Sequence, residues 1–513
     1  MRRFLLIAFI VLIACQAAGS PVPDPTNTAR PSPINSPLPT QPAPTPIPTP
    51  TSTPLPLLDE GYLVRLHPDG PLYVGDQVSI EVISPESEEQ EDRNVLIQVT
   101  GSAANDLGSS KFGAHGIGGR IQATFNWVWD TSDLQAGEYQ VKFSVQPAGP
   151  VWTETVNLLP KVEVPSPEPA ADWETVILDC CEINFITGTD FAEDVPELMD
   201  LIQAQAESVV SLMGKEFGER IPITILPRVL GHGGFAGSEI YVSYTDSNYA
   251  GNDLAQVLHH EMIHFLDRQL GGELRPSILV EGLAVYLSGG HFKKEPLIPR
   301  AAVLLELGWY IPLTDLSNSF YTSQHEIGYM EGGALVEFMV NRYGYHAFNA
   351  FYRDIEEHDS GDQSKALDLA LQEHFDLSLT QLEEQFKSEL YRRPINPDMY
   401  EDVILTVAYY EAVREYQRLL DPSAYFLTAW LPDGEEMRQR GIVADFLRRP
   451  STPLNLEIEE LLIEVDRELR AGNYLAAEKA LDQIERELDQ VQDEFLIGTY
   501  EVGEVQILGL GSD

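Results

Sequence analysis

The sequence predicts a multidomain chain in which a β-sandwich is followed by an α+β domain and then by an α-helical C-terminal region. Three observations predict this order. The chain has 513 residues, which is too long for one hydrophobic core. Apolar residues alternate with polar ones over residues 58–165, as in strands, and follow helical spacing farther along the chain. Proline-rich stretches precede and follow the alternating part.

The first fifteen residues, MRRFLLIAFIVLIAC, have the form of a signal peptide. Two arginines precede an apolar run that is too short to span a bilayer. The predicted signal-peptide segment, residues 1–15, ends in LIAC, which resembles the bacterial lipobox. In that family cleavage occurs just before the cysteine, which stays on the mature protein and carries the lipid. The resemblance implies an extracytoplasmic protein held to the cell membrane by acyl chains on Cys15. The alternative is an ordinary secretory signal in which this cysteine occurs by chance.

Residues 16–57 are rich in proline and threonine and offer little to bury, so we expect an extended linker between the anchor and the folded part. No later segment is apolar for long enough to span a membrane. The chain carries 80 acidic and 33 basic residues, a net charge of −47. Such a surface repels nucleic acid, so the sequence predicts no nucleic-acid partner.

Short alternating strands predict the sandwich over residues 58–165. In QVSIEVIS, NVLIQVTG and GEYQVKFSV every second residue is apolar, and PDG and QAGE mark turns between such runs. The stretch FNWVWDTSDLQAGEYQVKFSV resembles the end of bacterial immunoglobulin-like domains. The sequence indicates no chemistry there, and we expect a spacer or a module that binds carbohydrate or protein.

The α+β domain is expected over residues 172–392, after the boundary VPSPEPA. WETVILDCCEINFIT predicts one long strand or a hairpin, IPITILPRV and EIYVSY predict two more strands, and the remainder is mostly helical. Cys180 and Cys181 lie in the first of these segments. Adjacent cysteines rarely bridge each other, because disulfide geometry fits poorly across one peptide bond, so no disulfide is implied. We expect two small apolar residues in a strand, with a redox pair as the alternative.

Residues 393–513 predict an α-helical C-terminal region. Its last part contains two amphipathic patterns joined at AGNY, a pair that resembles one tetratricopeptide-type unit. A single unit cannot form a solenoid, so we expect the pair to pack on neighbouring helices.

The segment HHEMIHFLD carries the clearest chemical pattern of the chain. The apolar spacing from Leu254 to Leu270 predicts a helix that contains it, with Asn252 or Asp253 as the N-cap. His259 falls outside the motif described next. The alternative to a functional site is a helix whose histidines are satisfied within the fold.

On that helix, His260 and His264 lie one turn apart on one face and can occupy two corners of a zinc tetrahedron. Glu261 lies about 100° around the helix axis, where a carboxylate can reach a metal-bound water without being a ligand. The pattern is H-E-x-x-H.

A second apolar helix, predicted to begin at Pro276, supplies a third ligand in Glu281. A carboxylate among so many apolar residues is costly unless it is paired or binds a metal. Sixteen residues separate it from His264, which is room for a turn and a return to the first helix. Three protein ligands leave the fourth position of zinc open for water. The alternative is an exposed position on a one-sided helix.

H-E-x-x-H followed by a helix with EGLAVY resembles the gluzincins, and specifically bacterial peptidase-MA-like domains. The resemblance implies a thermolysin-like catalytic domain in which His260, His264 and Glu281 hold one Zn²⁺ per chain. YMEGGALVEFMVNRYG resembles a segment of zinc aminopeptidases whose tyrosine hydrogen-bonds the oxyanion, which implies that role for Tyr329. Glu331 stands where that motif has lysine. The alternative for Tyr329 is an ordinary aromatic residue at the start of a helix.

Four more features have open interpretations. GGFAGSEIYVSY would be an edge strand to which a peptide substrate adds. It contains Glu239 but not the G-A-M-E-N motif of the aminopeptidases, so strict aminopeptidase action is not implied. Asp267 either orients a ligand imidazole, pairs with Arg268 or another basic group, or faces solvent. His232, in GHGGF, lines the cleft or has no function.

Together these features predict a membrane-anchored, extracytoplasmic zinc metallopeptidase that acts on a peptide or protein, with Glu261 as general base and Tyr329 as oxyanion donor. The alternative is a catalytically inactive peptidase-fold lipoprotein that serves as a binding or adhesion module. Every residue that the chemistry needs is present, which favours the enzyme. A structural zinc site is favoured less, because such sites have four ligands and usually cysteine.

Overall fold

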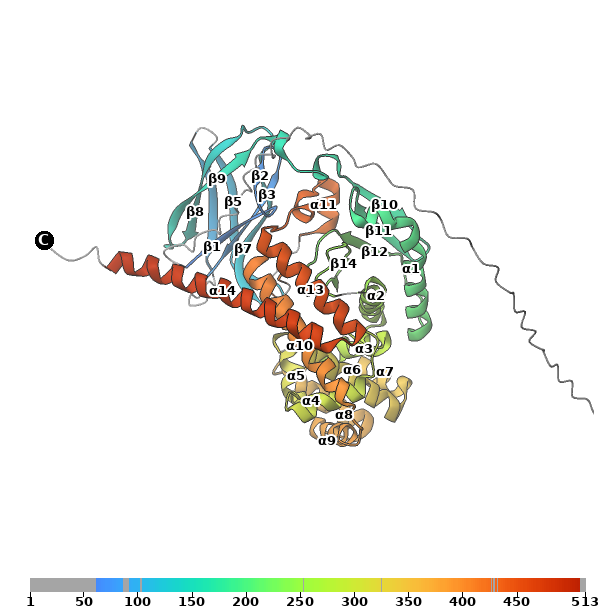
Figure 1. Cartoon of the computed structure of the whole chain (residues 1–513). Coiled ribbons are helices and arrows are strands. Elements are labelled where there is room, and N and C mark those ends of the chain that lie inside the picture. Colours follow the sequence, from blue (N-terminus) through green and yellow to red (C-terminus); the bar gives the residue numbers. More distant parts are fainter. Residues whose placement is uncertain are drawn as a thin grey trace, which may run out of the picture. The chain divides into compact units, whose positions relative to one another are not determined.

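The computed structural model describes residues 61–85, 92–101, 104–251, 253–323, 325–425, 427, 430 and 432–507. The predicted signal peptide, the predicted lipidation site at Cys15 and the predicted linker of residues 16–57 lie outside the described residues. Within the described part a sheet-rich region is followed by a largely helical one, as predicted (Figure 1). No helix in that part has both the length and the apolar character needed to cross a membrane.

The sheet-rich region consists of two sheets over one core. The first has the strand order β1-β3-β7-β6 and the second the order β2-β9-β8-β4-β5. The predicted runs QVSIEVIS, NVLIQVTG and GEYQVKFSV are β3, β4 and β8, and Val95, Ile97 and Phe143 are buried between the sheets. The bounds are β1 (Leu63–His67), β2 (Leu72–Tyr73), β3 (Gln77–Ile83), β4 (Asn94–Thr100), β5 (Asn105–Lys111), β6 (Gly113–His115), β7 (Arg120–Asp130), β8 (Gly137–Gln146) and β9 (Val151–Leu159).

A third sheet with the order β10-β11-β12-β14-β13 begins the next region. The hairpin alternative holds for WETVILDCCEINFIT, because β10 (Trp173–Ile177) and β11 (Cys181–Ile186) pair antiparallel. β12 (Ile221–Leu226) and β14 (Ile240–Ser243) continue the sheet in parallel, and α1 (Asp190–Met213) connects β11 to β12. β13 (Gly234–Ala236) pairs antiparallel with β14 and forms the edge.

Cys180 and Cys181 form a disulfide with each other, so the expectation of two unbridged cysteines was wrong. Along a regular strand, successive side chains point to opposite faces and could not meet. Cys180 instead lies in the bend of the β10–β11 hairpin, and Cys181 is the first residue of β11. The departure from strand geometry at this bend is what the sequence pattern did not reveal.

Helices α2 (Leu254–Leu270) and α3 (Ser277–Ser288) follow the sheet. Pro276 is the N-cap of α3 and lies one residue outside the helix that it was expected to begin. The remaining elements up to residue 390 are α4 (Leu297–Leu307), α5 (Leu313–Ser319), the 3₁₀ turn η4 (Phe320–Thr322), α6 (His325–Tyr343), α7 (Tyr345–Arg353), α8 (Gln363–Phe375) and α9 (Leu379–Leu390).

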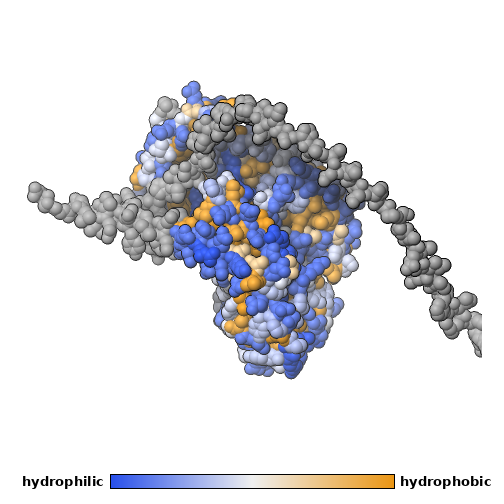
Figure 2. Space-filling view, in the orientation of Figure 1, coloured by the Kyte–Doolittle hydropathy of each residue, from blue (hydrophilic) through white to orange (hydrophobic). Residues whose placement is uncertain are grey.

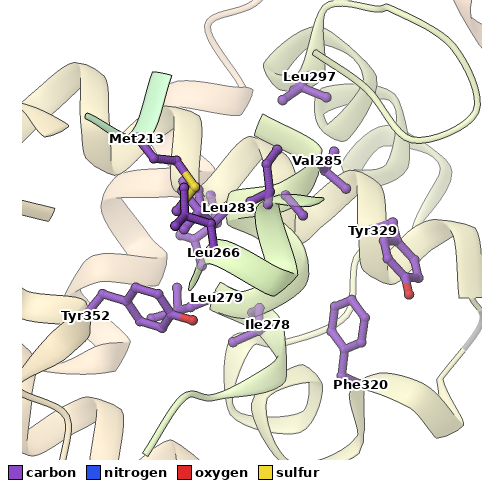
Figure 3. Close-up of a cluster of buried hydrophobic side chains, with 14 of the residues drawn as sticks. Met213, Leu266, Ile278, Leu279, Leu283, Val285, Leu297, Phe320, Tyr329 and Tyr352 are labelled. Carbon is purple, nitrogen blue, oxygen red and sulfur yellow. The ribbon is translucent and has the colours of Figure 1, made fainter. Parts of the chain in front are cut away.

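One large apolar core joins these helices to the sheet. Figure 3 shows part of it, where Leu266 of α2 and Met213 of α1 meet Leu279 and Leu283 of α3. α3 is apolar around most of its circumference, because α2 and α6 both pack on it. Burial on several sides is what makes this helix a fixed element for the residues it carries.

The crossing of α3 and α6 is a backbone-to-backbone contact. A Cβ atom on Gly282 would lie 2.4 Å from the carbonyl oxygen of Gly332, and one on Gly333 would lie 2.5 Å from Cγ1 of Val285. No side chain fits in either place. The contact holds α6 at a short distance from the turn of α3 that bears Glu281.

The C-terminal region is α-helical, as expected, with α10 (Pro397–Leu420), α11 (Gly434–Arg440), α12 (Ala444–Leu447), α13 (Pro453–Ala471) and α14 (Tyr474–Ile507). α13 and α14 are the predicted helix pair, and Gly472 ends α13 with a φ of 72°. Both helices pack on α10 around Tyr409, Ile458 and Leu462, so the expectation that the pair packs on neighbouring helices is confirmed.

Hydrophilic residues prevail on the face of the molecule shown in Figure 2, with smaller hydrophobic areas between them. This agrees with the acidic composition of the chain. One carboxylate is nonetheless fully buried inside the sandwich. Glu81 accepts hydrogen bonds from Arg120 Nη2 (3.1 Å) and Gln122 Nε2 (2.6 Å) and lies 3.2 Å from His67 Nε2.

Gly282→Ala is expected to lower the free energy of unfolding by about 1–3 kcal/mol, because its methyl group must push α3 and α6 apart. The matched control is Gly328→Ala on α6, where the nearest atoms would lie 3.5 Å away. That change is expected to leave stability equal or raise it by up to about 1 kcal/mol. Urea unfolding followed by circular dichroism measures both; an equal loss in the two variants would contradict the close-contact account.

Acid is expected to destabilise the sandwich through Glu81. Burial raises the pKa of this carboxyl, but His67 and Arg120 outweigh burial and hold the pKa at about 2. Because the folded pKa lies below the unfolded one, the stabilisation is complete above pH 4.5 and is lost as the pH falls toward 2. It amounts to roughly 3 kcal/mol. Urea midpoints at pH 7 and pH 3 should differ less in Glu81→Gln than in the wild type; an equal difference would contradict this account.

Candidate metal centre

Helix α2 begins where the sequence indicated. Asp253 is its N-cap, and its Oδ1 accepts a hydrogen bond of 3.1 Å from the backbone N–H of Gln256. The other N-cap candidate, Asn252, lies outside the described residues. From this start, His260 and His264 fall one turn apart on the same face, and their Nε2 atoms are 2.9 Å apart. The predicted pairing of the two imidazoles on one helix face is therefore present.

Glu281 of α3 joins the two histidines. Its Oε2 lies 3.3 Å from Nε2 of His260 and 3.1 Å from Nε2 of His264. The residue is buried, so the alternative of an exposed position on a one-sided helix was wrong. The sequence placed the glutamate on the correct helix, and the fold brings the two helices together.

The three ligand atoms have the spacing that a metal ion requires. Nitrogen and oxygen ligands about 2.0–2.1 Å from a tetrahedral ion lie about 3.3 Å from one another. Here the three separations run from 2.9 to 3.3 Å. Among the described residues, this is the group of three or more His, Cys, Asp or Glu whose ligand atoms all lie within 4.8 Å of one another. Two nitrogens and one carboxylate oxygen thus fit a divalent cation.

Of the two histidines, one has the neutral form that a metal ligand needs and the other does not. Burial, helped by the neighbouring His264, lowers the pKa of His260 to about 4, so its imidazole is neutral at pH 7. Burial lowers the pKa of His264, but the charge of the Glu281 carboxylate and its hydrogen bond together outweigh burial. The pKa of His264 is therefore raised to about 9. His264 and Glu281 therefore form an ion pair when no cation is bound, and a cation must replace the proton on His264.

Glu261 lies on the same helix, buried beside the edge strand β13. A Cβ atom on Gly234 of β13 would lie 2.4 Å from Cγ1 of Val257 and 3.4 Å from Oε1 of Glu261. The β13 backbone therefore runs directly along this carboxylate. Burial raises the pKa of Glu261 to about 7, so the group can take up and release a proton near neutral pH.

Tyr321, in η4, contacts Glu281, and this contact was not predicted from the sequence. Its hydroxyl donates a 2.5 Å hydrogen bond to Oε1 of Glu281, while Oε2 faces the histidines. The tyrosine thus fixes the carboxylate so that one oxygen is left for a cation. It lies 40 residues from Glu281, in a short turn without periodicity, and no motif marks it.

Tyr329 of α6 lies beside the triad, with its ring centroid 6.2 Å from that of His260. Burial and the nearby Glu281 carboxylate raise the pKa of Tyr329 well above its ordinary value, so the hydroxyl keeps its proton. The ring stacks on His291, with centroids 4.0 Å apart. His291 is a second residue that the sequence reasoning missed, and its Nδ1 lies 2.6 Å from a carboxylate oxygen of Glu326.

The C-terminal region also reaches the centre. The ring of Tyr410 of α10 lies 5.7 Å from that of His291 and stacks at 4.8 Å on His232. His232 therefore packs under α10, and the row Tyr410, His291 and Tyr329 leads from that helix to His260. The pattern of α10 alone gave no sign of this contact.

Asp267 belongs to an ion-pair cluster. It pairs with Arg275 at 3.1 Å and with Arg353 at 2.5 Å, and it accepts a hydrogen bond from Tyr352. Its partners are basic groups other than Arg268, one of the alternatives that the sequence left open. Nδ1 of His264 is buried without a hydrogen-bonding partner among the described residues, so Asp267 does not orient that imidazole.

Two further acidic residues have structural partners. Glu239 pairs with Arg438 of α11 at 2.9 Å and accepts from the hydroxyl of Thr224. Glu331, at the position of the aminopeptidase lysine, is buried and accepts a 2.7 Å hydrogen bond from the backbone N–H of Ile311. Both carboxylates serve the packing of loops and helices, and neither belongs to the triad.

Tyr321→Phe is expected to weaken binding of a divalent metal about 10- to 100-fold, because the ligand carboxylate loses the hydrogen bond that orients it. Tyr244→Phe is the control, since its hydroxyl also donates to a carboxylate, that of Asp194, at 2.7 Å outside the centre. Competition with a chromophoric chelator measures the affinity. Equal affinities in the two variants would show that Tyr321 does not position Glu281.

No protein-family model matches the chain, and no curated protein matches it in sequence. The resemblance to gluzincins therefore depends on the residues of the motifs alone. The geometry is independent of that resemblance: two histidines, one glutamate and a buried second glutamate converge beside a sheet edge.

Proposed function

We propose that the chain is a zinc-dependent metallopeptidase, anchored to the membrane through Cys15 and active on the extracytoplasmic side. One observation carries this function. His260, His264 and Glu281 offer three ligand atoms within 4.8 Å of one another, and Glu261 lies buried on the same helix. A structural zinc site would need a fourth protein ligand and would have no use for this second carboxylate.

The donor set favours zinc among divalent cations. Magnesium and calcium prefer oxygen ligands, whereas zinc takes imidazole nitrogen with carboxylate oxygen. Zinc held by these three residues would supply Lewis acidity toward a carbonyl and would lower the pKa of a bound water. The rest of the chemistry falls to side chains of the chain itself.

Glu261 is the proposed general base. Its carboxylate is positioned to take a proton from the attacking water and to pass that proton to the leaving amine. Burial raises its pKa to about 7, which suits both steps near neutral pH. Its position on α2, one residue after His260, would bring it near a bound cation without making it a ligand.

Tyr329 is the proposed oxyanion donor. A buried phenol that keeps its proton can donate a hydrogen bond to the charge that develops on the carbonyl oxygen. The stack on His291 limits rotation of the ring, and Glu326 contacts Nδ1 of that imidazole. The tyrosine is thus positioned before substrate arrives, which is the condition under which such a donor is effective.

The edge strand β13 offers a place for the substrate main chain. It is the last strand of its sheet and, among the described strands, pairs only with β14. A peptide added there as a further strand would run alongside Glu261, because Gly234 brings the β13 backbone close to that residue. This mode of binding favours an extended peptide or an unfolded protein segment as the substrate.

Glu261→Gln is expected to keep one zinc per chain and to lower the rate of peptide hydrolysis at least about 10²-fold, because the general base is lost. Glu281→Ala is expected to lose the zinc as well. Elemental analysis and cleavage of a peptide library measure the two properties, with Glu197→Gln on the exposed face of α1 as the control. Full turnover in Glu261→Gln would overturn its role, and absence of zinc in the wild type would overturn the metal site.

A further inference from the structure

A cavity of about 500 Å³ lies beside the first turns of α2 and is distinct from the triad. Four segments line it: α1, the start of α2, the end of α3 with the loop that follows, and α13. His259, the histidine outside the H-E-x-x-H motif, is among its lining residues. We call this cavity the α2 pocket.

Three cations gather at the α2 pocket in a chain that has 80 acidic and only 33 basic residues. Lys293 and Lys294 come from the loop after α3, and Arg470 comes from α13. One carboxylate, that of Asp253, also lines the pocket, so its lining charge is positive. Basic residues thus outnumber acidic ones three to one in the lining of the pocket, whereas acidic residues outnumber basic ones in the whole chain.

The three basic side chains differ in how much of their charge and how many of their N–H groups are already paired within the protein. Lys293 pairs with Asp402 at 2.6 Å, and Arg470 pairs with Asp466 at 2.8 Å. These pairs hold the two side chains in place while leaving some of their N–H groups for other acceptors. Lys294 is exposed and makes no ion pair among the described residues, so it carries most of the uncompensated charge.

Neutral donors complete the lining. The residue Ser288 is only 7% exposed, and its buried hydroxyl has no hydrogen-bonding partner in the described part of the chain. Such a group costs free energy unless something in the pocket meets it. The N-terminus of α2, a helix of 17 residues, adds partial positive charge at Ala255, whereas the backbone N–H of Gln256 is already bonded to the Asp253 cap.

We propose that the α2 pocket binds a small organic anion through a phosphate or carboxylate group. Lys294 supplies the charge, Ser288 and the backbone N–H of Ala255 supply hydrogen-bond donors, and Leu212 and Leu287 contact the apolar part of the ligand. This site is separate from the metal centre and does not depend on the proposed function. It gives His259, whose Nδ1 lies 3.1 Å from Oε1 of Gln205, a place in the wall of a binding site.

The test is calorimetric titration of the full chain with inorganic phosphate and, separately, with succinate. The protein is first stripped of metal, and the chelator is dialysed away, so that no cation at the triad can take up the anion. At least one of the two probes is expected to bind with one site per chain. Absence of binding by both probes at millimolar concentrations overturns the proposal.

Variants locate the bound anion. Lys294→Glu is expected to weaken binding by roughly tenfold or more, since a charge close to the anion is reversed. Ser288→Ala is expected to weaken it by about two- to tenfold through the loss of one hydrogen bond. Lys111→Glu makes the same change of charge on an exposed strand of the sandwich and is expected to leave the affinity unchanged. Equal effects of Lys294→Glu and Lys111→Glu would place the anion elsewhere and overturn the proposal.

Discussion

The centre depends on one interaction, the burial of the Glu281 carboxylate in an apolar helix. A charged group in that position is tolerated only if other groups meet it, and here His260, His264 and Tyr321 do so. The two imidazoles come from α2 and the phenol from η4, so one side chain of α3 contacts groups from two other elements. The close crossing at Gly282 then brings α6, with Tyr329, to the same place.

The parts of the centre that the sequence predicted are those encoded locally. The spacing of His260 and His264 follows from helix geometry, and the cost of Glu281 in an apolar segment is visible without a fold. Tyr321 and His291 could not be predicted, because they lie in irregular segments and reach the centre only through tertiary packing. The order of sandwich, mixed sheet and helices was predictable for the same reason as the motif, since each part has its own period.

The errors of the sequence interpretation also have a common physical cause. One expectation, that Cys180 lies in a regular strand, was wrong, and so was the alternative, set beside the expected buried ligand, that Glu281 occupies an exposed helix face. In the fold, the cysteine lies in a bend, and the helix is covered on more than one side. Periodicity describes the element but not its ends or the number of neighbours that pack on it.

The contact of Tyr410 with His232 and His291 bears on how this protein can be divided. A fragment that ended at residue 392 would retain the ligand histidines of α2 together with Glu281, Glu261 and Tyr329. Judged by its motifs alone, this fragment would look complete. It would nevertheless lack α10, which carries Tyr410 and is the inner helix of the C-terminal region. The surroundings of the centre are therefore shared between two stretches of chain, and recombination or truncation between them would separate parts of one site.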